Sequence, residues 1–392
     1  NTEFSDLDDL NTENPIVIEA LKDSYSFWIK EADVDGFRID TAIYVEPEFW
    51  PEFLEGEKGI FEVASELGKN AFLTYGEAWL NPMPFSNDAE KEIEQFFNWG
   101  FNSMLDFPLH TDIKRVFKEG KPTSYIKYRL EQREIMYSNP ARMVTFVDNH
   151  DMDRFLKASD INSLKQALSL IFTIPGIPTI YYGTEQNFIE TRATMFANGF
   201  ASGGQDHYDT NTPTFQFIKE LSELRKNTPT FKHGKIEVLF SDDLGPGPLV
   251  YKIFDDSKMY IVMMNTSSNK KHATGMDFNI EDGSVLRPLV VNNMVNKEIV
   301  YSNPYNILLN AKSLGIFEVT EQKEEVAKSG ISVEINNLSE NNTFTDNFVL
   351  TGTASGAKSV RIIVDGNEKE YAKVDLKQGI NEPWEVTINI SD

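Results

Sequence analysis

The chain has 392 residues, enough for two or three domains, and a formal net charge of -24 at pH 7. Nucleic acids and anionic membrane surfaces are bound through basic patches, so this negative charge argues against both as partners. A neutral sugar is compatible with the charge. An acidic composition can also serve solubility alone. Because the chain has no cysteine, disulfides, thiol catalysis and thiolate metal sites are excluded.

From about Asn14 to about Phe231, helical patterns alternate with short runs of β-forming residues. In Ile16–Glu31 the apolar side chains recur at helical spacing, and Gly36–Ile39 follows as a short strand. Further helices are predicted at Phe53–Leu67, Asp88–Phe97, Thr123–Tyr137, Ile161–Phe172 and Thr214–Lys226, and further strands at Ala71–Tyr75, Met104–Phe107, Met143–Val147 and Thr179–Tyr182.

This alternation predicts parallel strands joined by crossover helices, the pattern of an α/β fold. Five strand–helix units are counted, whereas a closed (β/α)8 barrel needs eight, so about three strands must come from elsewhere if the fold is a barrel. An open five-stranded sheet is the alternative. In such barrels the reacting groups lie at the carboxyl ends of the strands, which is where Asp40, Glu77 and Asp151 fall.

The character of the chain changes after about Lys232. Short β-rich runs separated by Asp-, Gly- and Pro-rich turns predict an antiparallel sandwich over 232–320. A charged link then leads to a third β segment, so that 321–392 is expected to hold a linker and a small immunoglobulin-like module. Trp384 is the only tryptophan of this module, which favours a spacer over a starch-binding platform.

The most apolar stretch, Ala167–Ile180, is too short for a membrane span and contains Pro175, so it is expected to be a buried element. The first ten residues lack the basic start and the apolar core of a signal peptide. The absence of cysteine fits a secreted bacterial protein, and we expect an extracellular location.

Three segments carry carboxyl groups in distinctive settings. In Gly36–Ala42 (GFRIDTA), Arg38 and Asp40 point to one face of a strand, and the arginine would keep Asp40 ionised. The alternative is a structural ion pair. In Tyr75–Trp79 (YGEAW), Glu77 follows an apolar strand and sits near an indole, a setting that raises a carboxyl pKa as a proton donor requires. The alternative there is a helix cap.

The third segment, Phe146–Asp151 (FVDNHD), has four polar residues in a row directly after a strand. A plain turn rarely needs a histidine between two acids, so His150 and Asp151 are candidates to bind sugar hydroxyls. Retaining glycoside hydrolysis needs one nucleophilic and one proton-donating carboxyl group about 5 Å apart, and a third polar group often holds the distorted sugar.

Together these segments resemble conserved regions of the α-amylase family, glycoside hydrolase family thirteen, in order, spacing and strand context. They are similar to its strand-four, strand-five and strand-seven regions, and Ser103–Pro108 and Pro178–Glu185 are similar to its sixth and eighth strands. The likeness covers roughly residues 1–320. It implies that 1–231 is the C-terminal part of a catalytic (β/α)8 barrel, holding about strands four to eight.

By this resemblance Asp40 is expected to be the nucleophile, Glu77 the general acid/base and Asp151 the carboxylate that stabilises the transition state. Arg38 would orient Asp40, and His150 would bind hydroxyls beside the cleaved bond.

Three further residues are expected to bind substrate. They are Trp79, next to the acid/base segment; Tyr44, where many members have a histidine; and Arg154, which resembles an arginine that contacts more distant sugars. A solvated loop arginine is the alternative for Arg154.

The resemblance also fails in places. We find no strand-three Asp-x-x-x-Asn-His segment before Asp40, and Leu7–Pro15 resembles the stretch that precedes strand four, so the N-terminal part of the barrel is expected as a partner. The asparagine of that segment often binds calcium; the resemblance therefore allows a structural calcium ion but locates no metal site, and the chemistry itself needs no cofactor.

The expected function is a retaining glycosidase acting on α-1,4-glucans. The alternative within enzymes is a transglycosylase, because Asp148–Phe155 and Tyr182–Gln186 are very similar to cyclodextrin glucanotransferases, with a wider likeness to neopullulanase-type members. A non-catalytic glucan-binding barrel is the alternative from another class, but such relatives lose catalytic carboxylates and all three are present here.

Overall fold

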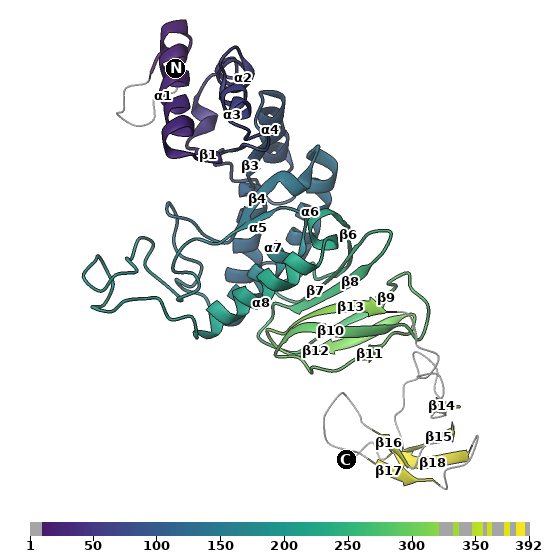
Figure 1. Ribbon diagram of the computed structural model, residues 1–392. Helices are drawn as coiled ribbons and strands as arrows, with labels where there is room; N and C mark the ends of the chain where they lie inside the picture. Colours follow the sequence, from purple (N-terminus) through teal and green to yellow (C-terminus); the bar gives the residue numbers. More distant parts are fainter. Residues whose placement is uncertain are drawn as a thin grey trace. The chain divides into compact units, whose positions relative to one another are not determined.

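The computed structural model describes residues 10–320, 332–336, 347–355, 359–362, 372–376 and 382–388. The chain divides into two compact units, Asn1–Thr320 and Glu321–Asp392. Figure 1 shows the helices and strands of both.

Five parallel strands form the first sheet, and they lie side by side in chain order. They are β1 (Gly36–Ile39), β2 (Leu73–Gly76), β3 (Ser103–Leu105), β4 (Met143–Phe146) and β5 (Ile177–Thr179). The predicted parallel α/β arrangement is confirmed. Within the described residues β1 and β5 each pair on one side only, and they are more exposed than the fully buried β3 and β4.

Helices alternate with the strands along the chain, as predicted. They are α1 (Pro15–Ala32), α2 (Phe49–Glu55), α3 (Ile60–Glu66), α4 (Asp88–Asn98), α5 (Phe107–Ile113), α6 (Ser124–Met136), α7 (Ile161–Thr173), α8 (Pro213–Asn227) and α9 (Thr230–His233). The first begins at a capped end: the Asn14 side chain accepts a hydrogen bond from the Ile16 amide, and Pro15 occupies the first turn.

One helix prediction and one strand prediction need correction. The single helix expected over Phe53–Leu67 is two short helices, α2 and α3, because the chain turns at Gly56–Gly59 with Lys58 in the left-handed region (φ 56°). The strand expected up to Phe107 ends at Leu105, because Asp106 caps α5 by accepting from the Leu109 amide. A π-helical turn, Lys114–Lys118, extends α5.

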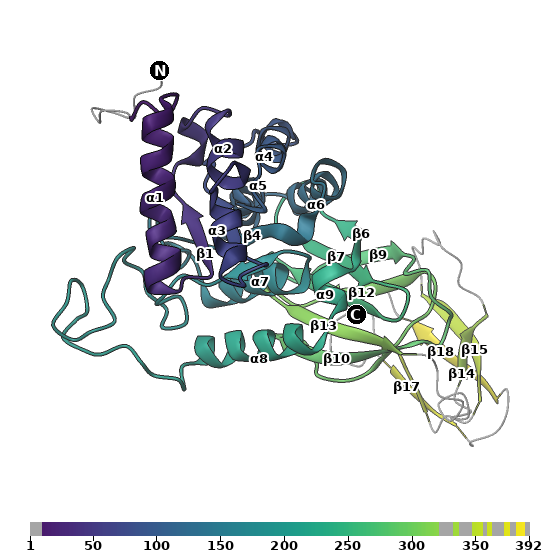
Figure 2. The same ribbon diagram turned by 45° about the horizontal axis from the view of Figure 1, so that its top comes forward.

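The last parallel strand is also shifted from its prediction. It was expected at Thr179–Tyr182 and is found at Ile177–Thr179, so the two tyrosines at 181 and 182 lie beyond its carboxyl end. A long connection without helix or strand, residues 180–212, then leads to α8. We call it the β5–α8 arm; Figures 1 and 2 show it in teal, extending away from the strands.

Antiparallel strands follow, as predicted for 232–320. A six-stranded sheet has the order β11-β10-β13-β8-β7-β6, and a two-stranded sheet pairs β12 with β9. The bounds are β6 (Lys235–Ser241), β7 (Pro248–Phe254), β8 (Met259–Asn265), β9 (Lys271–Met276), β10 (Val285–Asn292), β11 (Ile299–Val300), β12 (Tyr305–Leu309) and β13 (Leu314–Thr320).

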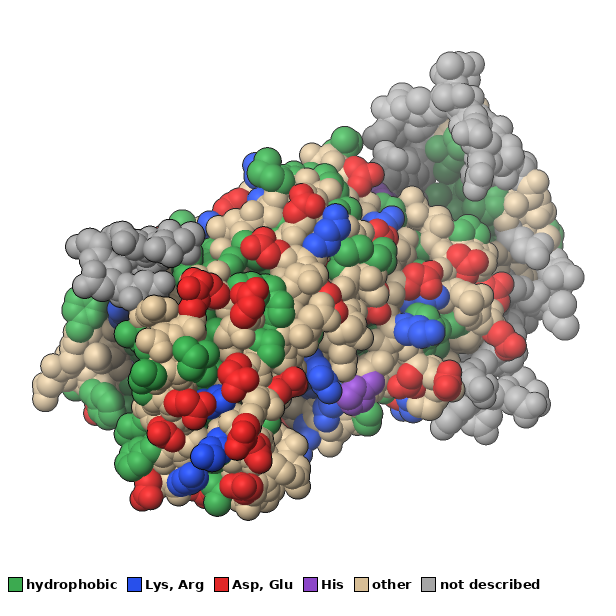
Figure 3. All heavy atoms as spheres, turned by 90° about the horizontal axis from the view of Figure 1, so that it is seen from above, with side chains coloured by type: hydrophobic (Ala, Val, Ile, Leu, Met, Phe, Trp, Pro, Cys, Tyr) green, Lys and Arg blue, Asp and Glu red, His purple; other side chains and the backbone are tan. Residues whose placement is uncertain are grey.

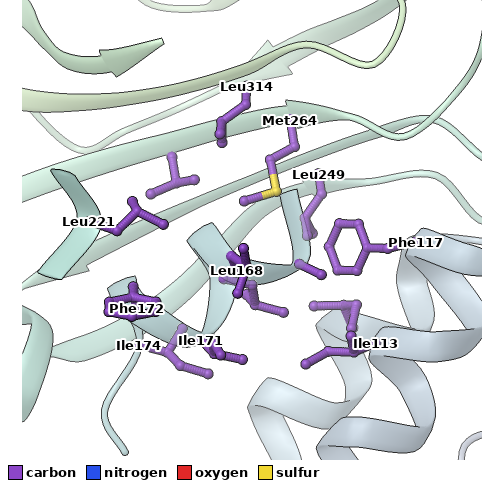
Figure 4. Close-up of a cluster of buried hydrophobic side chains, with 14 of the residues drawn as sticks. Ile113, Phe117, Leu168, Ile171, Phe172, Ile174, Leu221, Leu249, Met264 and Leu314 are labelled. Atoms are coloured by element: carbon purple, nitrogen blue, oxygen red, sulfur yellow. The ribbon is translucent and has the colours of Figure 1, made fainter. Parts of the chain in front are cut away.

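The α/β part and the antiparallel part share one hydrophobic core. Figure 4 shows side chains of α5, α7 and α8 meeting those of the larger antiparallel sheet. The labelled members are Ile113, Phe117, Leu168, Ile171, Phe172, Ile174, Leu221, Leu249, Met264 and Leu314. This core crosses position 231, and both predicted parts lie in the compact unit that ends at Thr320.

A buried arginine joins several segments within this unit. The Arg225 guanidinium of α8 donates through Nη1 to the carbonyls of Phe172 (2.8 Å), Ile174 (2.9 Å) and Phe231 (2.9 Å), and through Nη2 to that of Gly176 (2.6 Å). These hydrogen bonds hold the end of α7 next to the start of β5. They therefore also set the position from which the β5–α8 arm begins.

The second unit consists of short antiparallel strands in two small sheets. They are β14 (Ser332–Ile335), β15 (Phe348–Ser355) and β18 (Glu382–Ile388) in one, and β16 (Ser359–Ile362) and β17 (Ala372–Asp375) in the other. Trp384 is buried against Leu350 and Ile388, so its indole belongs to the core of this module and offers no surface for stacking on a sugar. The immunoglobulin-like assignment stays a prediction.

The surface carries the acidic excess of the sequence. On the face in Figure 3, acidic side chains are spread among basic and hydrophobic ones. In the part of the chain that the structure describes, no helix combines the length and apolarity required to cross a membrane.

The Arg225 contacts predict a large effect on stability. Arg225→Met should lower the free energy of unfolding by about 3 kcal/mol or more, because four carbonyls of a buried region lose a charged donor. Denaturant unfolding would measure it, with Lys226→Met, the same change at the exposed next position, as control. Equal losses in both variants would contradict this role.

Candidate active site

The parallel register of β1 and β2 places the first two predicted carboxylates together. Ile39 pairs with Gly76, so Asp40 and Glu77 both leave the sheet at its carboxyl edge. The Glu77 amide donates to the Ile39 carbonyl at 2.8 Å, which continues the strand pairing by one step. The position of these residues follows directly from the strands that carry them.

Arg38 links the two carboxyl groups. Its Nη1 lies 2.6 Å from Asp40 Oδ1, and its Nη2 lies 2.9 Å from Glu77 Oε2. The rigid fork of a guanidinium suits two such contacts, whereas a lysine offers a single point charge. The Thr41 amide also donates to Glu77 Oε2 at 3.4 Å, from a backbone in the left-handed region (φ 46°).

The two carboxyl groups differ strongly in their environment. The Glu77 side chain is 5% exposed and that of Asp40 is 65% exposed. Burial, followed by a hydrogen bond to Asp40, raises the pKa of Glu77 to about 7 although Arg38 opposes this. The same hydrogen bond, together with Arg38 and His150, lowers the pKa of Asp40. The pair therefore holds one proton near neutral pH, and it resides on Glu77.

Glu77 Oε1 supports this assignment of the proton. It is buried and has no hydrogen-bond donor among the residues that the structure describes. A buried oxygen without a donor is more costly in a charged carboxylate than in a neutral carboxyl group, so its surroundings favour the protonated form of Glu77.

The third predicted carboxylate, Asp151, lies in the loop after β4. Its Oδ2 is 2.9 Å from His150 Nε2, and its Oδ1 is 2.9 Å from Arg192 Nη2. Its direct partners are thus His150 and Arg192, not Asp40 or Glu77. His150 nevertheless influences two of the carboxylates, because it contacts Asp151 and contributes to the lowered pKa of Asp40. The structure brings the first two carboxylates into contact, while the third contacts His150, whose charge also acts on Asp40.

The loop after β4 is held from inside by Asp148. This buried carboxylate accepts from the Phe155 amide (2.9 Å) and from the Thr184 hydroxyl (3.1 Å), while burial raises its pKa. In the sequence, Asp148 stands out only as part of the FVDNHD segment. Its supporting role depends on the segment around Thr184, and no local pattern reveals that contact.

Trp79 and Tyr44 remain accessible. Trp79 is partly exposed and stacks on Phe107 with ring centroids 5.3 Å apart. It borders a cavity of about 450 Å³ that also reaches His110 and Met152. Tyr44 ends a short 3-10 turn (Ala42–Tyr44) and is also partly exposed. Both are placed where a ligand could reach them, and their binding roles stay predictions.

The assignment of Arg154 needs correction. The residue is 0% exposed, so it neither faces a cleft nor lies in solvent. Its Nη2 donates to the Tyr182 carbonyl at 2.6 Å, and its guanidinium lies 4.0 Å from the centroid of the Tyr181 ring. Arg154 therefore binds the start of the β5–α8 arm to the loop after β4 instead of binding a sugar.

One residue of the site was missed altogether. Arg192 contacts Asp151 from the β5–α8 arm, 41 residues further along the chain. No motif surrounds it, and only the tertiary path of the arm brings it to the site.

Within the described residues, no group of three or more acidic or histidine side chains is arranged to hold a metal ion. Calcium therefore stays a prediction, and no step below involves it.

Comparison with known proteins places this site in a family. The α-amylase catalytic domain matches residues 1–206, more than half of the chain. The chain belongs to the α-amylase family.

Its family relatives include both hydrolases and transferases. The chain is 31% identical over 291 residues to a cyclomaltodextrin glucanotransferase of Bacillus sp. (strain 38-2), covering 71% of this chain and 36% of that protein. It is 29% identical to an α-amylase of Streptomyces lividans, covering 69% and 32% respectively. The chain thus spans about a third of the length of these curated relatives.

A solved structure agrees with this membership. The α-amylase of Anoxybacillus superposes with a TM-score of 0.66 at 26% identity, covering 81% of this chain and 66% of that one. The family and this likeness imply a fold of the TIM-barrel type for the parallel-sheet part of this α-amylase-family chain.

The Arg38 contacts predict how the proton of Glu77 responds to a substitution. Glu77 should release its proton at about pH 7. Arg38→Met should shift this titration to higher pH, because removal of the cation disfavours the buried carboxylate. Infrared difference spectra against Glu77→Gln would follow the Glu77 carboxyl band. Glu131→Gln, on an exposed position of α6, is the matched acidic control, and a downward shift in Arg38→Met would contradict the assignment.

Proposed function

We propose that this α-amylase-family chain carries the catalytic groups of a retaining glycosidase that acts on α-1,4-glucans such as starch, maltooligosaccharides or cyclodextrins. The supporting observation is the Asp40–Glu77 pair, with hydrogen-bonded carboxyl groups and pKa values shifted in opposite directions. Inverting enzymes keep their carboxyl groups about 6.5–9.5 Å apart to admit a water, so direct contact favours retention.

In the first step Asp40 Oδ attacks the anomeric carbon while Glu77 gives its proton to the departing glycosidic oxygen. Asp40 suits the nucleophile because its pKa is lowered and its side chain is exposed. Glu77 suits the acid because it keeps its proton up to about pH 7. The products of this step are a glycosyl ester on Asp40 and a free sugar hydroxyl.

In the second step the Glu77 carboxylate removes a proton from the incoming hydroxyl, whose oxygen attacks the anomeric carbon and releases Asp40. Arg38 holds both groups in place throughout, since it contacts each of them. Asp151 and His150 would hold ring hydroxyls of the distorted sugar. The configuration is retained after two displacements.

The second candidate is an α-glucan transglycosylase, such as a cyclodextrin glucanotransferase or a 4-α-glucanotransferase. It is favoured by the sequence likeness to cyclomaltodextrin glucanotransferases. The two candidates differ only in whether water or a sugar hydroxyl reaches the Asp40 ester. Shorter linear products from maltooligosaccharides indicate hydrolysis, and longer or cyclic products indicate transfer. A non-catalytic binding barrel would bind these sugars and leave them intact.

We propose further that strands from outside the described residues complete the barrel. β1 and β5 each have one strand neighbour in the described part of the chain. A closed barrel of this type has eight strands and no edges, so about three additional parallel strands would pair with these two edges. These strands are the expected polypeptide partner of the site.

Asp40→Asn tests the nucleophile in the natural protein that carries this sequence. We expect turnover of maltooligosaccharides to fall by several orders of magnitude, because the amide cannot form the glycosyl ester. Asp23→Asn, the same change on an exposed position of α1, should keep normal turnover. Near-normal activity in Asp40→Asn would refute the assignment.

Glu77→Gln tests the proton donor separately. Cleavage of natural glucans should be lost, while the first step on substrates with a good leaving group is spared because that step needs no proton. In the wild type, kcat/KM on natural glucans should fall as the pH rises above about 7, since the acid form of Glu77 is then depleted. Equal loss of that first step on both kinds of substrate, seen as the initial release of the leaving group, would remove the acid role.

A further inference from the structure

The β5–α8 arm is attached to the loop after β4 through three consecutive residues, Glu190 to Arg192. Arg154 Nε donates to the Glu190 carbonyl (3.3 Å), and Thr191 Oγ1 donates to the Met152 carbonyl (3.1 Å). Arg192 Nε donates to the His150 carbonyl (3.0 Å). Residues 190, 191 and 192 of the arm thus contact residues 154, 152 and 150 of the loop, in that order. The two segments therefore run antiparallel.

Arg192 makes a second contact at the end of this register. Its Nη2 lies 2.9 Å from Asp151 Oδ1, while His150 Nε2 lies 2.9 Å from Asp151 Oδ2. Both oxygens of the carboxylate are therefore oriented by a neighbour. One guanidinium group thus contacts both the His150 carbonyl and the Asp151 carboxylate. These two contacts together orient the Asp151 side chain relative to its own loop.

The ion pair contributes little to the stability of the fold. The Arg192 side chain is 65% exposed, and exposed ion pairs contribute little net stability because both charges remain solvated and are screened by salt. Two connected contacts on one carboxylate and its neighbouring carbonyl are nevertheless enough to select one orientation of Asp151. A residue of this kind should affect the reaction more than the folding equilibrium.

We propose that Arg192 is a positioning residue that presents Asp151 to the substrate and couples the placement of the β5–α8 arm to the active site. The inference deepens the proposed function, because it assumes that Asp151 acts on the reacting sugar. Arg192 acts through Asp151 and His150 and need not contact the sugar ring itself.

The test compares Arg192→Gln and Arg192→Lys with the wild type in the natural protein on maltooligosaccharides. Misplacement of a catalytic group can cost about 100-fold, so we expect kcat to fall about 10- to 100-fold in Arg192→Gln with a smaller change in KM. Arg192→Lys should recover only part of this loss, because an ammonium cannot form both contacts in the same geometry.

Two further readouts distinguish positioning from a structural role. The thermal midpoint of Arg192→Gln should match that of Arg287→Gln, which removes another exposed ion pair, Arg287–Glu298, in the antiparallel part. High salt should lower the wild-type kcat toward that of Arg192→Gln while affecting the variant less, because salt screens exposed pairs. An unchanged kcat in Arg192→Gln, or a loss equal to that of Arg287→Gln, would overturn the inference.

Failure of the proposed function gives a different result. If the wild type turns over no α-glucan, that function fails, and calorimetric binding of maltoheptaose then tests Arg192 by itself. Weaker binding in Arg192→Gln than in Arg287→Gln would support the positioning of Asp151 toward the sugar. Equal binding, or none in any of the proteins, would overturn it.

Discussion

The guanidinium of Arg38 lies between two carboxyl groups that leave adjacent parallel strands, and the chemistry of the site depends on this contact. It brings a positive charge to a buried glutamate and an exposed aspartate at once. Burial then keeps the proton on Glu77, while Arg38, His150 and the hydrogen bond from Glu77 keep Asp40 ionised. Arg38 thus contacts two carboxyl groups that differ in burial, and this difference gives Glu77 and Asp40 different protonation states.

This contact requires that β1 and β2 keep their register. A slip of one residue would turn Arg38 and Asp40 to the opposite face of the sheet and separate them from Glu77. The register is supported from a distance, since the buried β3 and β4 lie beside β2 and the helices behind them share a core with the antiparallel sheet. The antiparallel part therefore packs against the helices that cover the parallel sheet.

The loop after β4 is positioned in another way. Asp148 binds the Thr184 hydroxyl, and Arg154 binds the Tyr182 carbonyl at the beginning of the β5–α8 arm. Further along the same arm, Arg192 contacts Asp151. Polar contacts between two irregular segments thus perform here the function that strand pairing performs for Asp40 and Glu77. Such contacts are more easily displaced, so the orientation of Asp151 depends more on its surroundings than the orientation of the other two carboxylates.

The sequence by itself determined the elements and the chemistry of the first two segments. The strand before Asp40, the helix that precedes it and the order of strands and helices depend on residues within a few positions of one another, and such patterns can be recognised locally. The three segments also sufficed to suggest the family. The local signals failed at Gly56–Gly59 and at Asp106, where a break and a cap interrupt longer patterns.

Only the tertiary structure decided the partners of the side chains. Arg154 and Arg192 are both arginines near one loop, yet the first is buried under the arm and the second reaches Asp151 from it. The difference depends on the path of a 33-residue connection without regular structure, residues 180–212. Burial, and with it the pKa of Glu77, likewise depends on what packs around a side chain, and contacts between residues far apart in the chain leave no periodic signal in the sequence.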